Sequence, residues 1–156
     1  MSEPDEISSG IITFRVTREE LIEVLLLDHG SHISHPKGHI EEGETPGQTA
    51  LRELKEETDL ELVVISPDPI YTGEYPIEKN GRTLTKKVSY FAGVIHRNEV
   101  VRISPEHIAF YWKDVRGARR MITHEGDKLA LDSAATWLLQ NDSTPIFTAG
   151  RLSQLG

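Results

Sequence analysis

A helix is predicted over residues 46–58, and the way it begins constrains this chain more than any other feature. Thr45 is a good N-cap residue, and Pro46 suits the first helical position, where a missing N–H does no harm. Gln48, three residues after Thr45, completes a capping box. A loop that contains glycine leads directly into this point. We therefore expect the chain to pass from loop to helix at Thr45 without a spacer.

The predicted helix carries three carboxylates on one face. Residues three and four apart share a face, so Glu53, Glu56 and Glu57 should form one acidic cluster. Crowded hard oxygen ligands suit Mg²⁺ or Mn²⁺. The neighbouring face, which can pack on a sheet, consists of Ala50, Leu51, Leu54 and Thr58. The plainer alternative is a solvated acidic face on which Arg52 and Lys55 only balance charge.

Length and charge narrow the class of protein. The 156 residues are enough for one domain with a single sizeable core, which we expect to span about residues 10–140 of a domain over 1–156, with 141–156 as a loosely held tail. A net charge of −8 argues against long RNA or DNA as a partner. The chain has no cysteine, which excludes a disulfide framework and a thiol nucleophile. Because no apolar run approaches membrane-spanning length and the acidic N-terminus lacks an apolar core, we expect a cytoplasmic protein without membrane contact.

The remaining pattern is that of an α+β protein. Apolar and β-branched runs predict strands over 10–16, 21–27, 60–65, 70–77, 83–95 and 108–112. Asn80-Gly81 is a favoured hairpin turn between two of them. A helical turn is predicted over 115–121, and a final helix should begin with Asp127 as its cap and bury Leu129 and Trp137. Strands in two groups, with the acidic helix and a C-terminal helix on either side, make an αβα sandwich with a mixed sheet.

The loop and the acidic helix together resemble the signature of the Nudix hydrolases, a pattern Gly-x5-Glu-x7-Arg-Glu-Leu-x-Glu-Glu. The matching residues are Gly38, Glu44, Arg52, Glu53, Leu54, Glu56 and Glu57. The resemblance implies the Nudix fold and hydrolysis of a phosphoanhydride that depends on Mg²⁺ or Mn²⁺. The family's glycine near the end of the motif is Asp59 here, at a position that we expect to be left-handed.

By this resemblance each signature residue has a role. The metal ligands would be the Gly38 carbonyl with Glu53, Glu56 and Glu57. Arg52 would orient the carboxylates, and Glu44 would support it. The base that takes the proton from the attacking water would be Glu57, Glu53 or Glu106.

The residues before the signature are similar to those of the asymmetric diadenosine tetraphosphate hydrolases. Pro36-Lys37-Gly38-His39 and Ser104-x-Glu106-His107 carry this similarity. It implies cleavage of diadenosine tetraphosphate to ATP and AMP, with Glu106 as a further metal ligand or base. The substrate-binding residues would be Lys37 and Lys87 on phosphate, His32 on phosphate or base, Tyr90 stacked on adenine, and Phe110 as the opposite wall.

Several alternatives stay open. Tyr90 and Phe110 could be core residues. The histidines at 29, 32, 35 and 39 could suggest zinc, but they lie in a turn-rich stretch beside carboxylates, and His39 is expected to pack. Another Nudix substrate, such as a nucleoside triphosphate, a 5′-triphosphate RNA end or an inositol or sugar pyrophosphate, is possible by the signature alone, as is a nucleotide-sensing module without catalysis. A monomer and a dimer fit the sequence equally.

Overall fold

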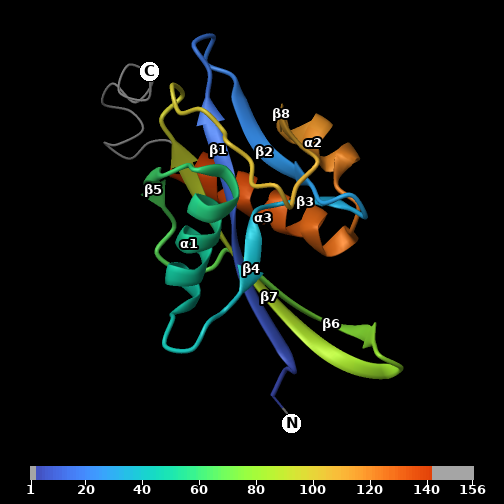
Figure 1. Ribbon diagram of the computed structural model, residues 1–156. Coiled ribbons are helices and arrows are strands. Elements are labelled where there is room, and N and C mark those ends of the chain that lie inside the picture. The colour runs from blue at the N-terminus through green and yellow to red at the C-terminus, as the bar shows by residue number, and fades with distance from the viewer. Residues whose placement is uncertain (1–2, 142–156) are drawn as a thin grey trace.

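The computed structural model describes residues 3–141 and shows a mixed sheet between helices (Figure 1). The predicted tail, 142–156, lies outside the described residues. The elements in chain order are β1 (Glu6–Val16), β2 (Ile22–Asp28), β3 (Ile33–Ser34), β4 (Lys37–His39), α1 (Pro46–Thr58), β5 (Leu62–Ile65), β6 (Tyr71–Lys79), β7 (Arg82–Ile95), β8 (Ala109–Lys113), α2 (Val115–Met121) and α3 (Glu125–Gln140). No helix among these residues is long and apolar enough to cross a membrane.

Strand β1 is the centre of the sheet. It pairs in parallel with β7 and antiparallel with β2 and with the short strand β4. The path β3-β2-β1-β7-β5 is extended by β8 on β2 and β6 on β7. Because β1 runs beside β4 at Ser8–Gly10, the loop that leads into α1 is fixed to the middle of the sheet.

Two apolar cores cover the two faces of the sheet, as alternation along β1 requires. Ile12 and Phe14 point into the core under α2 and α3, and Ile11 points into the core under α1. Figure 1 shows α1 in front of the sheet and α3 behind it. The predicted αβα sandwich is confirmed.

The β6–β7 hairpin extends away from the body of the molecule (Figure 1). Its strands pair from Tyr71↔Tyr90 to Lys79↔Arg82. Asn80 and Gly81 form the turn with φ of 55° and 75°, the left-handed values that a type I′ turn requires. The hairpin was predicted from these two residues.

The last helix differs from its prediction at both its start and its face. α3 begins at Glu125 after His124, so the prediction that Asp127 caps it is wrong. Asp127 lies in the first turn, and its carboxylate accepts hydrogen bonds from Ser34 and Tyr90. Leu129, expected in the core, is 43% exposed, because only one stripe of α3 packs on the sheet.

Candidate functional site

The helix α1 begins as its sequence predicts. Thr45 Oγ1 accepts from the N–H of Gln48, and Gln48 Oε1 accepts from the N–H of Thr45, so the capping box is complete. At the other end Asp59 adopts φ 61° and ψ 21°. This confirms the left-handed conformation expected where the family has glycine. Its carboxylate pairs with Lys55 Nζ at 2.9 Å.

Arg52 joins the acidic residues of the loop to those of the helix. Its Nε donates to Glu44 Oε2 at 2.7 Å, and its Nη2 donates to Glu44 Oε1 at 3.0 Å. Its Nη1 donates to Glu53 Oε1 at 2.9 Å and to Glu56 Oε2 at 3.1 Å. The bond from Arg52, with further bonds from the Glu41 backbone and Thr49, lowers the pKa of Glu44 to about 2. A two-pronged contact of this kind fixes the orientation of both partners.

Glu57 is the most deeply placed of the carboxylates, with a side chain that is 7% exposed. Its Oε1 accepts from the backbone N–H of Lys37 at 2.9 Å, and its Oε2 lies 2.9 Å from Nε2 of His107. Burial, reinforced by the charges of Glu53 and Glu106, raises the pKa of Glu57 to about 8. The pKa of Glu53 is raised as well, first by burial. These acids repel one another unless a cation lies among them.

A cavity of about 440 Å³ lies in front of these acids. Its lining residues are Ser8, His29, His32, Lys37, Gly38, Glu53, Glu57, Lys86, Glu106 and His107. We call it the acid cavity. Its residues come from β1, from the loop and strand before α1, from α1 and β7, and from the turn before β8.

The residues of the acid cavity fit a hard divalent cation by chemistry. The backbone of Gly38 lies directly against the Glu53 carboxylate, so that a Cβ at this position would overlap its atoms. Gly38 lines one cavity with Glu53, Glu57 and Glu106, and carbonyl and carboxylate oxygens are the ligands that Mg²⁺ and Mn²⁺ prefer. Within residues 3–141 no three His, Asp or Glu side chains enclose a point as an ion cage does. Mg²⁺ is usually held by one or two carboxylates, its own waters and substrate phosphate, so a closed cage is not required.

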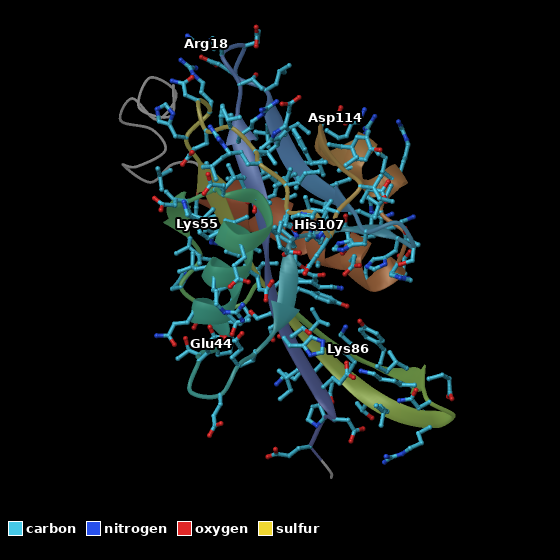
Figure 2. The ribbon with its side chains drawn as sticks, viewed as in Figure 1. Arg18, Glu44, Lys55, Lys86, His107 and Asp114 are labelled. Carbon is cyan, nitrogen blue, oxygen red and sulfur yellow. The ribbon has the colours of Figure 1, made fainter. Side chains whose placement is uncertain are left out.

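A second cavity of about 570 Å³ adjoins the first, and we call it the hairpin cavity. His32, Lys37 and Lys86 line both cavities. The rest of the hairpin cavity is formed by β6 and by the start of α3, with Tyr71, Gly73, Glu74, Tyr75, Pro76, Ile77, His124, Gly126 and Asp127. Figure 2 shows Lys86 where the β6–β7 hairpin leaves the sheet. The two lysines thus lie between a carboxylate site and a site with two tyrosines.

Six of the predicted site residues line the acid cavity: His32, Lys37, Gly38, Glu53, Glu57 and Glu106. Arg52 and Glu44 support the carboxylates from outside this lining, and four other residues lie elsewhere. Glu56 is at the rim, with a side chain that is 59% exposed. Phe110 lies on β8 and lines neither of these two cavities, so its role as a wall stays a prediction. Lys87 is also outside both linings, because successive residues of a strand point to opposite faces and Lys86 has the inward position.

Tyr90 is a core residue, and the expectation that it stacks on adenine is wrong for this structure. Its side chain is 1% exposed, and its hydroxyl donates to Asp127 Oδ1 at 2.8 Å. The ring of the buried His35 meets it edge-on at 5.2 Å. Both faces of the ring are therefore covered by protein. His39, expected to pack, has a side chain that is 63% exposed and lies near Glu6.

Sequence reasoning missed Ser8, His29, Lys86, Tyr75 and His124. Lys86, Val88 and Tyr90 lie on the same face of β7, because side chains alternate along a strand. If Val88 and Tyr90 had been assumed to point inward, the sequence would have favoured Lys86 over Lys87 as the residue at the site. Nothing in the sequence indicates that β6 lies close to the start of α3. The sequence therefore could not predict that the tyrosines of β6 line a cavity.

Comparison with known protein families decides the class. Residues 6–131 match the NUDIX domain. The chain belongs to the Nudix family. Its fold agrees with this assignment, and so does the position of the signature on the β4–α1 loop and helix. The chain is therefore a Nudix hydrolase.

Individual relatives extend the comparison. The chain is 34% identical over 145 residues to a mouse protein named asymmetrical bis(5′-nucleosyl)-tetraphosphatase, covering 87% of this chain and 95% of that protein. A Caenorhabditis elegans protein of the same name is 32% identical over 116 residues, with 71% and 80% covered. A crystal structure of a C. elegans Ap4A hydrolase binary complex superposes with a TM-score of 0.73 at 25% identity, covering 86% of this chain and 98% of that one.

Gly38→Ala should abolish most activity without unfolding the protein. The new methyl group would overlap the Glu53 carboxylate and displace it, and a misplacement of about 1 Å can cost roughly 100-fold in rate. We expect kcat/KM for the nucleotide that the wild type cleaves to fall by about that factor, with an unchanged far-UV circular dichroism spectrum.

Gly47→Ala is the matched control. A Cβ at Gly47 makes only an ordinary contact with Phe91 at 3.7 Å, in the first turn of the same helix. Equal activity of the two variants would contradict the account of Gly38.

Proposed function

We propose that this Nudix hydrolase cleaves a dinucleoside polyphosphate, with diadenosine tetraphosphate giving ATP and AMP as the preferred reaction. The observation that supports this most is that two cavities share Lys37, Lys86 and His32. A chain of phosphates requires cations along its length, and a nucleoside requires a partly apolar cavity with aromatic residues. Relatives named for this activity point the same way.

In this proposal the acid cavity holds the phosphate that is attacked. The Gly38 carbonyl with Glu53, Glu56, Glu57 and Glu106 would hold Mg²⁺ or Mn²⁺, which would polarise the phosphate and lower the pKa of a water molecule. A carboxylate oxygen of Glu57, Glu53 or Glu106 accepts the proton that the attacking water loses. Arg52 keeps Glu53 and Glu56 in orientation through its bonds to both.

Lys37, Lys86 and His32 hold the phosphates beyond the one attacked. Lys37 and Lys86 supply positive charge where the two cavities meet, in a protein with a net charge of −8. The pKa of Lys86 is lowered by burial, and then by the charge of Lys37. Two lysines that repel one another in this way are both stabilised by an anion between them.

The hairpin cavity holds one nucleoside, and Tyr75 takes the role first assigned to Tyr90. Tyr75 is 42% exposed and lines this cavity, which the ring of His124 also lines. A base can therefore stack on an exposed ring here without opening the core. The far nucleoside is left without an assigned residue.

A nucleotide panel with product analysis tests the reaction. Diadenosine tetraphosphate should be cleaved to ATP and AMP with a kcat/KM above those for ATP, dGTP and a 5′-triphosphate RNA. Activity should vanish in a chelator and return with Mg²⁺ or Mn²⁺. A preference for a nucleoside triphosphate would overturn the substrate while leaving the hydrolase, and full turnover in chelator would overturn the metal-dependent reaction.

Tyr75→Ala tests the base site. Stacking contributes about 1–3 kcal/mol, so KM for diadenosine tetraphosphate should rise by roughly 5- to 150-fold. The contact is the same in ground and transition states, and kcat should therefore stay within about twofold. Tyr90→Phe, which removes only a buried hydroxyl, should lower stability and leave KM unchanged. The reverse pattern would return the stacking role to Tyr90.

A further inference from the structure

The turn before β8 places an imidazole against the deepest carboxylate of the acid cavity. We propose that His107, held in orientation by Ser104, is a positioning residue for the carboxylate of Glu57. This inference rests on the proposed function in that Glu57 serves catalysis, but it does not depend on which nucleotide is cleaved. Figure 2 shows His107 beside the upper end of β4, the strand that supplies Lys37.

Ser104, His107 and Glu57 form a chain of hydrogen-bonded side chains. His107 Nε2 lies 2.9 Å from Glu57 Oε2, and His107 Nδ1 lies 3.0 Å from Ser104 Oγ. The His107 side chain is only 2% exposed, so water does not compete for either ring nitrogen. The other oxygen of Glu57 is bound by the N–H of Lys37. Each oxygen of the carboxylate thus has one protein partner.

The chemistry of these groups decides where the protons lie. An ionised carboxylate only accepts hydrogen bonds, and Glu57 would be ionised with a divalent cation among the acids. Nε2 of His107 must therefore carry the proton. In a neutral ring Nδ1 is then an acceptor, so the Ser104 hydroxyl must donate to it.

The opposite tautomer would set two acceptors against each other. With the proton on Nδ1, the lone pair of Nε2 would face Glu57 Oε2, and the carboxylate would lose one of its two partners. Glu57 could then rotate about its last side-chain torsion. The carboxylate of Glu57, which only accepts, therefore selects the tautomer, and the hydroxyl of Ser104, which can donate or accept, fixes the orientation of the ring.

The backbone holds this turn in place independently of the three side chains. The N–H of Ser104 donates to the Glu57 carbonyl at 3.0 Å, and the N–H of Arg102 donates to the Thr58 carbonyl at 2.9 Å. On the other side the N–H of Ile108 donates to the Asp28 carbonyl at 2.9 Å. Because these bonds involve no side chain, substitutions at Ser104 should leave the turn in position. The same turn carries Glu106 into the acid cavity.

The test combines the tautomer with the rate in the full chain, loaded with Mg²⁺. Imidazole ¹⁵N NMR should show the His107 proton on Nε2 in the wild type. Ser104→Ala should leave the proton on Nε2, because Glu57 only accepts, but it should free the ring to turn. We therefore expect kcat to fall by at least about tenfold, with KM within about threefold, because a loosened carboxylate affects the rate and not substrate binding. Ser104→Thr keeps the hydroxyl and should restore kcat.

A second pair of variants changes the ring itself. His107→Gln keeps an N–H that can reach Glu57 and should keep most of kcat, whereas His107→Leu should lose at least about tenfold. The proposal is overturned if the wild-type proton is on Nδ1, if Ser104→Ala leaves kcat unchanged, or if Gln and Leu are equally impaired. Kinetics are measured with whichever nucleotide the wild type cleaves. If the wild type does not cleave diadenosine tetraphosphate, the proposed substrate is wrong, and the variants still test the role of His107 on the nucleotide that is cleaved.

Discussion

The buried carboxylate of Glu57 is the constraint on which the site depends. It is bound by the N–H of Lys37 on one side and by His107 on the other, so it joins strand β4, the helix α1 and the turn before β8. A carboxylate placed this deep among other acids is unfavourable by itself, and its pKa of about 8 reflects that cost. Strongly raised pKa values of this kind cluster at functional sites, which agrees with the proposed role of Glu57 in holding a cation.

Local signals in the sequence were sufficient for most of the fold. The capping box and Asn80-Gly81 act through residues a few positions apart, so α1 and the β6–β7 hairpin were predicted with their bounds nearly right. The prediction for α3 failed because Asp127 serves partners that are distant in sequence, Ser34 and Tyr90, and not the helix start. A capping pattern cannot reveal a competing contact with another element.

In the site, too, local spacing could be predicted and contacts between distant elements could not. The signature on α1 predicts which carboxylates share a face, since helical spacing determines that. The pairing of β7 with β1 decides whether Lys86 or Lys87 faces the cavity. The path of the β6–β7 hairpin decides that Tyr75 is exposed while Tyr90 is buried. These are long-range properties, and residue type alone does not contain them.

The central claim is that the carboxylates of α1 hold a divalent cation, and Mn²⁺ binding followed by electron paramagnetic resonance tests it without substrate. Glu57→Gln keeps the shape of the side chain and removes its charge, while Glu61→Gln removes a charge from an exposed residue just beyond α1, where the side chain is 74% exposed. The account predicts that Glu57→Gln weakens Mn²⁺ binding by at least about tenfold, or roughly 1.4 kcal/mol, and that Glu61→Gln matches the wild type. Equal Mn²⁺ affinity of all three proteins would contradict it.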